Sequence, residues 1–150
     1  MVAMQISTKL RYGSRALAEL ARAHPDTTLS VRELAERQNI SEKYLEHIMS
    51  ALKSARVVRS VRGKYGGYEL ERDPESITLT EVFRVLEGSP APVDCVESPD
   101  SCELSPTCPT RQTWLEMRNA VRDVLEKTTI QDLAERGRRK TEEQPEMYHI

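Results

Sequence analysis

Two serine-capped segments joined by a short turn restrict how residues 30–52 can fold. Ser30 and Glu33 form a capping box, in which the hydroxyl and the carboxylate each satisfy a free amide at the start of a helix. That helix spans residues 31–38, and Ser41 caps a longer helix after the turn. The longer helix has one apolar face, made of Tyr44, Leu45, Ile48, Met49 and Leu52. A short helix, a tight turn and a longer helix are the outline of a helix-turn-helix.

The segments on either side complete a winged helix-turn-helix domain, which we expect to span residues 1–88. An apolar stripe at helical spacing predicts a helix over residues 10–23. Two short β-branched or aromatic runs flank a Gly-rich tip, which predicts a hairpin, or wing, within residues 57–70. A further capping box, Thr78 with Glu81, opens the last helix of this domain. The predicted fold class is mainly α with a small β-hairpin wing.

Three cysteines gather in one acidic segment, residues 89–109, and the chain has no others: Cys95, Cys102 and Cys108. The segment is rich in Pro and contains no Lys or Arg. Six and five residues separate the cysteines, which is typical of a loop folded around something rather than of core thiols. An odd number of cysteines also argues against a disulfide framework.

A long helix follows the cysteine segment. Apolar residues recur at steps of three, four and three, which predicts a heptad-like seam on a helix over residues 111–127: Trp114, Met117, Val121 and Val124. The seam can pack within the protomer, but a long helix of this kind after a small winged domain favours a homodimer that reads a pseudo-palindromic site. We assign residues 110–135 to this dimerisation helix and one short terminal helix. Residues 136–150 are polar and charged, and we expect them to be disordered.

Length and composition exclude several classes of protein. The N-terminus has no apolar core of a signal peptide, and no stretch approaches the ~18 apolar residues that span a membrane. We therefore expect a cytoplasmic protein without a membrane partner. The three histidines, His24, His47 and His149, are widely spaced, and no nucleophile triad or carboxylate pair stands out. We expect no enzymatic activity.

Positive charge is concentrated on the longer helix and the wing, although the chain has a net charge of −2. No acidic residue lies between His47 and Tyr68, whereas five basic residues do: Lys53, Arg56, Arg59, Arg62 and Lys64. A charge run alone is typical of a solvated helix face. Because this run coincides with a helix-turn-helix and a Gly-rich wing, it predicts DNA binding that weakens with salt.

Individual DNA contacts follow from the expected docking geometry. The first turn of a recognition helix faces base edges, where Lys43 and His47 can donate to purine acceptors. Tyr44 can reach a phosphate or a thymine methyl, or can equally be a core residue. Arg62 at the wing tip suits a narrow minor groove. The residues that we expect to contact DNA are Lys9, Arg11, Ser41, Lys43, Tyr44, His47, Arg59, Arg62, Gly63 and Lys64.

The chain resembles a known family over roughly residues 4–135. The matching features, in order, are Lys9-x-Arg11-Tyr12-Gly13, Ile40-Ser41-x-x-Tyr44-Leu45-Glu46, Val61-Arg62-Gly63-x-x-Gly66-Gly67-Tyr68-x-Leu70 and the three-cysteine loop. Together they resemble the IscR-type iron–sulfur regulators, the bacterial winged-helix family that also holds the nitric-oxide sensor NsrR and the cysteine-metabolism regulator CymR. The resemblance implies a homodimeric transcription factor with a cluster near the dimerisation helix. It also implies cluster ligation by the three cysteines, minor-groove entry by Arg62, and a role of Glu46 in site discrimination.

The chain departs from the family pattern at two points. Six residues rather than five separate the first two cysteines, and Arg111 stands where cluster-binding members often have a histidine. An arginine stays protonated and is no normal ligand, so the fourth ligand is open. Glu46 is our first candidate, because it would link the cluster to the DNA-reading helix. The others are Asp94, Glu97, Glu103, a residue from the partner's N-terminal helix, and water.

The residues of the cysteine loop are compatible with several occupants. Thiolates favour an iron–sulfur cluster, 2Fe–2S before 4Fe–4S. Bare thiols acting as a redox sensor are second, and zinc is disfavoured because neither a fourth cysteine nor a histidine completes the set. We expect a regulator whose DNA affinity or site choice responds to the cluster, controlling cluster-biogenesis genes, with the cluster ordering residues 94–109. A nitric-oxide sensor, and a cluster-free regulator that responds to thiol redox state, a partner protein or a metabolite, are the alternatives. A ferredoxin-like carrier would leave the basic wing unexplained.

Overall fold

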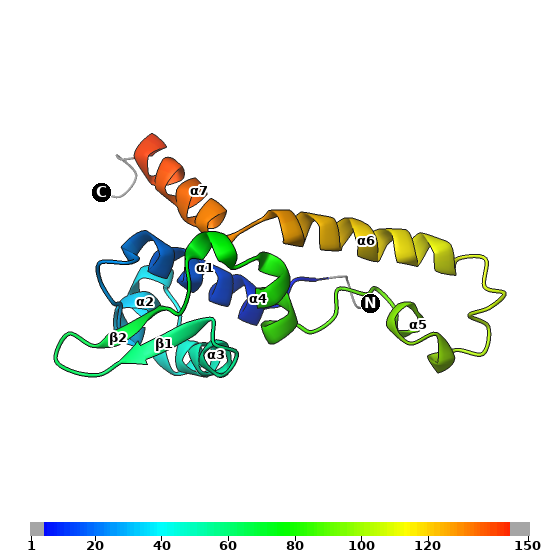
Figure 1. The fold of residues 1–150 in the computed structure, drawn as a ribbon, viewed down its shortest axis with the longest axis horizontal. Coiled ribbons are helices and arrows are strands. Elements are labelled where there is room, and N and C mark those ends of the chain that lie inside the picture. Colours follow the sequence, from blue (N-terminus) through cyan, green and yellow to red (C-terminus); the bar gives the residue numbers. More distant parts are fainter. Residues whose placement is uncertain (1–4, 145–150) are drawn as a thin grey trace.

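The computed structural model describes residues 5–144 and has a winged domain at one end of a long helix (Figure 1). In chain order the elements are α1 (Thr8–Ala23), α2 (Val31–Gln38), α3 (Glu42–Ser54), β1 (Val58–Val61), β2 (Gly67–Leu70), η1 (Pro74–Ser76), α4 (Leu79–Leu86), α5 (Asp94–Glu97), η2 (Pro99–Ser101), α6 (Arg111–Lys127) and α7 (Ile130–Glu143). The predicted fold class, mainly α with a hairpin wing, is confirmed.

The helix-turn-helix forms as its capping residues predict. The Ser30 hydroxyl accepts from the Glu33 amide at 3.1 Å, and the Glu33 carboxylate accepts from the Ser30 amide at 2.8 Å. Asn39 ends α2 in the left-handed conformation, with φ 53°. Ser41 then caps α3 by accepting from the Tyr44 amide at 3.1 Å. Local hydrogen bonds thus fix both the start of each helix and the turn between them.

The wing is a two-stranded antiparallel hairpin that is fastened to the domain through Leu29. Leu29 and Tyr68 exchange two main-chain hydrogen bonds, at 3.0 and 2.7 Å, next to the β1–β2 pairing. Gly67 makes this approach possible, because a Cβ at its position would lie 2.5 Å from the Leu29 carbonyl oxygen. The base of the wing is therefore hydrogen-bonded to the segment before α2.

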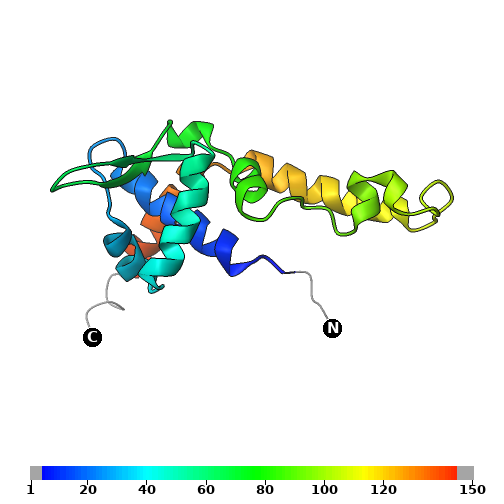
Figure 2. The same ribbon diagram turned by 90° about the horizontal axis from the view of Figure 1, so that it is seen from below.

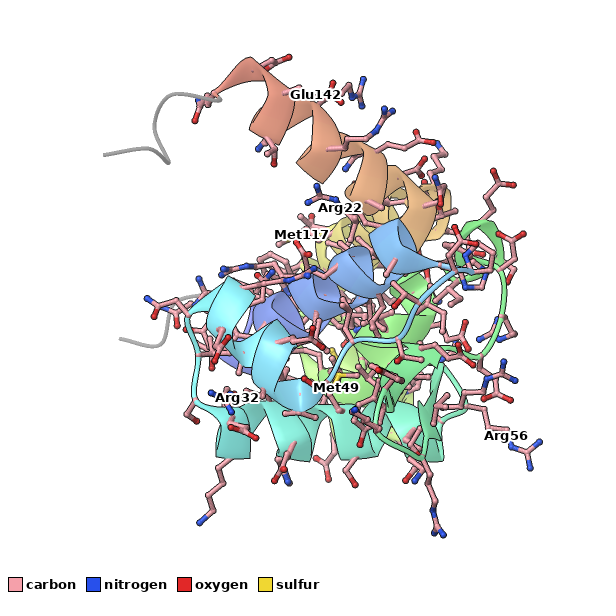
Figure 3. The ribbon with its side chains drawn as sticks, turned by 90° about the vertical axis from the view of Figure 1, so that its left-hand side faces the viewer. Arg22, Arg32, Met49, Arg56, Met117 and Glu142 are labelled. Atoms are coloured by element: carbon pink, nitrogen blue, oxygen red, sulfur yellow. The ribbon has the colours of Figure 1, made fainter. Side chains whose placement is uncertain are left out.

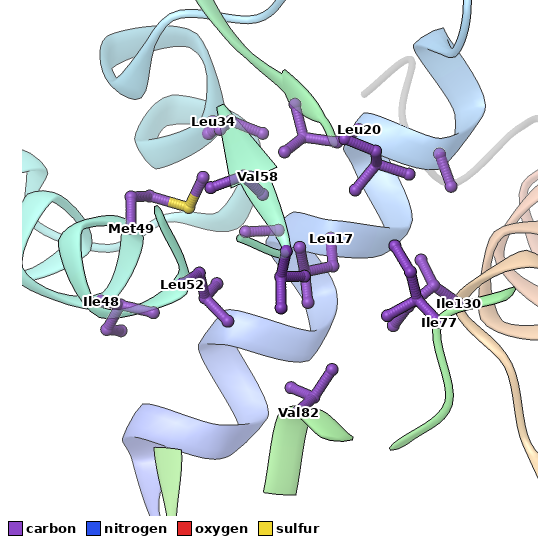
Figure 4. Packing of buried hydrophobic residues seen from close by; sticks show 14 of the residues in the cluster. Leu17, Leu20, Leu34, Ile48, Met49, Leu52, Val58, Ile77, Val82 and Ile130 are labelled. Atoms are coloured by element: carbon purple, nitrogen blue, oxygen red, sulfur yellow. The ribbon is translucent and has the colours of Figure 1, made fainter. Parts of the chain in front are cut away.

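Aliphatic side chains from all parts of the winged domain form one core (Figure 4). The core includes Leu17 and Leu20 of α1, Ile48 and Leu52 of α3, and Val58 of β1 (Figure 4). After α6 the chain returns to this core, where Ile77 and Ile130 are both fully buried (Figure 4). The Ile130 amide donates to the Ile77 carbonyl at 2.9 Å, which ties the start of α7 to the segment before α4.

Two predicted details are wrong. The terminal helix is longer than expected: α7 continues to Glu143, so residues 136–143 are helical and not disordered. Residues 145–150 of the predicted tail lie outside the described part of the chain. The capping box at Thr78 is only half formed, because its hydroxyl accepts from the Glu81 amide while the Glu81 carboxylate pairs with Arg72 instead.

The long helix α6 extends away from the winged domain and carries the cysteine loop at its far end (Figures 1 and 2). It has no buried residue within the single chain. The short helix α5 lies along its first half, and α4 contacts its last turns. Within residues 5–144, no helix combines the length and the apolar character needed to cross a membrane.

Candidate nucleic-acid interface and cysteine loop

The recognition helix α3 has one buried and one exposed face. Leu45, Ile48, Met49 and Leu52 are fully buried and fix the rotation of the helix. Lys43, Glu46 and His47 are exposed, and no carboxylate of the described residues pairs with Lys43. In Figure 3 Met49 turns into the domain, whereas Arg56 after α3 projects away from it. The exposed face therefore offers a cation and an imidazole one turn apart.

Tyr44 and Ser41 have structural contacts. The Tyr44 ring meets the Tyr12 ring edge to face, with centroids 6.0 Å apart, and its hydroxyl lies 3.1 Å from the Thr8 hydroxyl. The side chain is half-buried against the core. These contacts join the first turn of α3 to the first turns of α1. These contacts support the interpretation of Tyr44 as a core residue. Ser41 serves as the N-cap of α3.

The two basic residues predicted on the N-terminal helix differ in environment. Lys9 is half-buried and Arg11 is exposed. The Arg11 guanidinium lies 5.8 Å from the centroid of the Tyr12 ring, within reach of a cation–π interaction. Arg11 lines a groove between α1 and α7.

The wing presents its cations at an exposed tip. Arg62 and Lys64 are exposed, and neither has a carboxylate partner among the described residues. Gly63 adopts φ 121°, a conformation that side chains disfavour, and its carbonyl accepts from the Gly66 amide at 3.0 Å. The tip is thus a defined turn that holds two free positive charges.

Arg59 differs from the other wing cations. It faces Glu69 across the hairpin, and its Nε donates to the Glu69 carboxylate at 2.6 Å. Glu69 lies just beyond the acid-free run that predicted the basic patch, so only the strand register reveals this pair. The positive charge of Arg59 is already compensated in the free protein.

The cysteines are distributed along the loop rather than gathered. Cys95 lies in α5 and is half-buried, Cys102 follows η2 and is exposed, and Cys108 precedes α6 and is half-buried. Within residues 5–144, no three Cys, His, Asp or Glu side chains form a group that could hold a metal ion.

Guanidinium groups of α6 fasten this loop. Arg111 donates to the Cys95 carbonyl, Arg118 donates to the Val96 carbonyl at 3.4 Å, and both Arg118 and Arg122 reach the Glu97 carboxylate. These arginines were not among the predicted site residues. Their spacing of seven and four, which places them on one side of a helix next to an acidic loop, was the available signal.

The surroundings of Cys108 change the pKa of its thiol. Its pKa is lowered, first by a hydrogen bond with the Thr110 hydroxyl, 3.2 Å from the sulfur, and then by the Thr110 amide and by Arg111. Since the thiolate is the metal ligand and the nucleophile, these contacts favour the reactive form.

The first candidate for a fourth ligand, Glu46, lies far from the cysteines of its own chain. Glu46 is on α3, whereas the loop is at the opposite end of the molecule in both views (Figures 1 and 2). Closer to the cysteines, the Ser105 hydroxyl is buried and has no hydrogen-bond partner. Ser105 lines a cavity of about 280 Å³ together with Cys102 and Arg111.

Comparison with known proteins decides the family. Residues 6–136 match the Rrf2 family, described as an iron-dependent transcriptional regulator. The chain belongs to the Rrf2 family. It is 42% identical to the HTH-type transcriptional regulator CymR of Bacillus subtilis, over 87% of this chain and 90% of that protein. It is 32% identical to IscR of Vibrio parahaemolyticus, over 87% of this chain and 77% of that protein.

Solved structures agree with this assignment. The structure of B. subtilis CymR, described as the global cysteine regulator, matches with a TM-score of 0.75 and 41% identity, over 89% of this chain and 98% of that chain. The structure of T. potens IscR matches with a TM-score of 0.74 and 32% identity, over 90% of this chain and 89% of that chain. This Rrf2-family chain is thus a winged-helix transcriptional regulator that binds DNA as a homodimer, and it is not an enzyme.

Proposed function

We propose that this Rrf2 regulator changes its DNA affinity or site choice with the state of the loop that holds Cys95, Cys102 and Cys108. An iron–sulfur cluster is the first candidate occupant, 2Fe–2S before 4Fe–4S. The supporting observation is that α6 arginines tie the loop to the same helix that returns to the winged core. A change in the loop can therefore shift α6, and with it the spacing of two recognition helices in the dimer.

The donor set fits a cluster in type. Three thiols are the ligands that clusters prefer, and the unpartnered Ser105 hydroxyl is a polar group beside Cys102 that an occupant could satisfy. A bound cluster would supply a redox-active centre that oxidants or nitric oxide can attack. Glu46 of the same chain is remote, so the fourth position falls to Asp94, Glu97, Glu103, a group of the partner or water.

This chain's own residues have separate parts in the mechanism. Arg111 holds the Cys95 carbonyl and fixes the start of α6 against α5, while Arg118 and Arg122 hold the Glu97 carboxylate. Thr110 keeps Cys108 closer to its thiolate form. If residues 94–109 closed around an occupant, the hydrogen bonds from these arginines would transmit the movement to α6.

The homodimer forms, in this proposal, through the α6 seam. Trp114, Met117 and Val121 are half-buried within the chain, and Val124 is 65% exposed, so the seam lacks a complete partner. We place the partner's α6 in the apolar groove of about 610 Å³ between α1 and α7. Four basic residues line that groove: Arg11, Arg15, Arg136 and Lys140. The helix α6 carries two exposed acids beside its seam, Glu116 and Asp123.

DNA contacts are proposed on the surface that α3 and the wing share. Lys43 and His47 would meet base edges in the major groove, and Arg62, Gly63 and Lys64 would meet the minor groove. Arg59 would contribute only after it leaves Glu69. Genes of cluster biogenesis are the first expected targets, and likeness to a cysteine regulator makes cysteine-metabolism genes the second. The protein would act in the cytoplasm.

Anaerobic purification tests the cluster. The expected result is a coloured protein, or a colourless one that gains visible absorption with iron and sulfide, and that then binds promoter DNA with altered affinity. A protein in which all three cysteines are replaced by Ala should keep its fold and bind DNA in one state only. If the reconstituted protein stays colourless, the cluster proposal is wrong.

Direct thiol sensing is the second candidate, favoured by the lowered pKa of Cys108 and the exposure of Cys102. A relative, Staphylococcus aureus CymR, has also been solved in an oxidised form. Under this alternative, peroxide would change DNA binding of the cluster-free protein, and Cys108→Ser would abolish that response. A cluster-free protein indifferent to peroxide excludes it.

A further inference from the structure

The tip of the wing carries an exposed aromatic side chain, Tyr65, that is not among the DNA contacts proposed above. Tyr65 is 84% exposed, more than any other exposed large hydrophobic residue of residues 5–144. Tyr68, three residues later in the same hairpin, is half-buried against the core and pairs with Leu29. The two tyrosines of the wing therefore have different environments, and packing explains only Tyr68.

The backbone beneath Tyr65 is held in place. The Thr28 hydroxyl donates to the Tyr65 carbonyl at 2.8 Å. The Gly66 amide donates to the Gly63 carbonyl at 3.0 Å, which closes the turn around the tyrosine. Gly66 also packs too closely on the Val61 carbonyl to accept a Cβ, which would lie 2.3 Å away. A hydrogen-bonded turn thus leaves the Tyr65 ring in solvent, where its apolar faces are available for burial against a partner.

Positive charge surrounds this ring. The Lys64 ammonium lies 5.6 Å from the centroid of the Tyr65 ring, and Arg62 is exposed in the same turn. The tip combines a flat apolar group with two cations and contains no acid. The minor groove has the complementary chemistry, since its walls are apolar deoxyribose faces and its potential is negative.

We propose that Tyr65 is a DNA-contacting residue that packs its ring against a deoxyribose wall of the minor groove. In this position it would brace Arg62, whose guanidinium reaches the groove floor. Figure 1 shows the hairpin extending beyond the body of the domain, which leaves room for a duplex around the tip. The inference rests on the winged-helix DNA binding of the family and is independent of what the cysteine loop holds.

Salt dependence separates the ring from the cations. Removal of one phosphate-binding cation reduces the slope of log K against log salt by about 0.9. If Lys64 neutralises a phosphate at the edge of the minor groove, Lys64→Ala should weaken binding and flatten the slope. Tyr65→Ala should weaken binding to the protein's own promoter by about tenfold with the slope unchanged, because an aromatic contact carries no charge. Tyr65→Phe should stay within about twofold of the parent protein, since the ring and not the hydroxyl packs against the sugar.

The experiment measures the binding of full-length protein to promoter DNA by fluorescence anisotropy at several salt concentrations. Hydroxyl-radical cleavage, which attacks deoxyribose in the minor groove, supplies the second measurement. Protection of the sugars at the wing position should disappear in Tyr65→Ala and persist in Tyr65→Phe. Thermal unfolding of Tyr65→Ala should match the parent protein, whereas Tyr68→Ala should unfold at lower temperature. A Tyr65→Ala variant that binds within about twofold of the parent, or that flattens the salt slope as Lys64→Ala does, overturns the proposal.

Discussion

Arg111 donates two hydrogen bonds to the main-chain carbonyl oxygen of Cys95, from Nη2 at 3.2 Å and from Nε at 3.4 Å. The bonds connect the first residue of α6 to the helix that contains the first cysteine. A guanidinium cannot lose its proton under ordinary conditions, so Arg111 holds the backbone of the loop without becoming a ligand. At the position where the family resemblance predicts a histidine, this chain has an arginine that holds the loop against α6.

The exchange of this clamp for a ligand should change how a cluster is retained. Arg111→His places a neutral imidazole beside the loop, and we expect reconstituted protein to lose its cluster to a chelator about tenfold more slowly, an effect within the range known for groups that tune metal sites. Visible absorption against time measures the loss. Arg111→Gln removes the clamp without adding a ligand nitrogen, and should not slow the loss. Equal retention in both variants would show that this position has no access to the cluster.

Thr110 should control the reactivity of Cys108. With Cys95 and Cys102 replaced by Ser, alkylation of the remaining thiol reports its pKa, which we expect below the ordinary value of about 8.5. Because the Thr110 hydroxyl is the first cause of the lowered pKa, Thr110→Val should move the midpoint of the rate–pH profile upward. The thiolate is the reacting form, so the rate at neutral pH should fall.

Thr107→Val is the matched control for this measurement. Its hydroxyl bonds to the Leu104 carbonyl and not to a thiol, so the same removal of a hydroxyl in the same loop should leave the Cys108 profile unchanged. If the midpoint of the rate–pH profile does not change in Thr110→Val, or changes equally in Thr107→Val, the Thr110 hydroxyl is not the cause of the lowered pKa of Cys108.

Local patterns predicted the helix starts well and the end of the chain poorly. The Ser30 and Ser41 caps are hydrogen bonds between residues close in sequence, so the sequence contains their whole cause. The helical state of residues 136–143 has a tertiary cause at its start, because Ile130 and Ala134 are buried. The Thr129 capping box starts the helix there, and Arg, Lys and Glu residues, which favour helix, extend it past Gly137.

The candidate site likewise combines features with local causes and features with tertiary causes. Cations at the wing tip were predictable from composition and turn chemistry, and Arg62 and Lys64 are exposed there. The pairing of Arg59 with Glu69 depends on strand register, and the attachment of the cysteine loop to α6 depends on how α5 packs. Neither relationship is between sequence neighbours, so single-sequence patterns do not contain it. The roles of the predicted DNA contacts and ligands stay predictions.

Release of Arg59 should strengthen DNA binding. Glu69→Gln removes the paired carboxylate, and surface pairs of this kind contribute about 0.2–1 kcal/mol, so we expect a gain of at most about fivefold in affinity. If the freed Arg59 then meets a phosphate, the salt slope steepens by about 0.9. Glu71→Gln, which removes the same charge from an exposed residue that pairs with no arginine of residues 5–144, should leave the slope unchanged. Identical slopes in the two variants would mean that Arg59 makes no phosphate contact.

The dimer proposal predicts that Val124 of one chain and Gly137 of its partner lie in the same interface. Val124→Glu should weaken the dimer at least tenfold, or about 1.4 kcal/mol, because it buries an unpaired charge in an apolar seam. Gly137 lines the α1–α7 groove, and a Cβ there meets nothing within 4 Å in the single chain. Gly137→Leu should thus fold normally but fill the groove and weaken the dimer. Glu135→Leu, at an exposed position of α7 outside the groove, controls for added apolar surface. Sedimentation equilibrium of each variant decides between the arrangements, since a dimer built from α6 against α6 alone would respond to Val124→Glu and ignore Gly137→Leu.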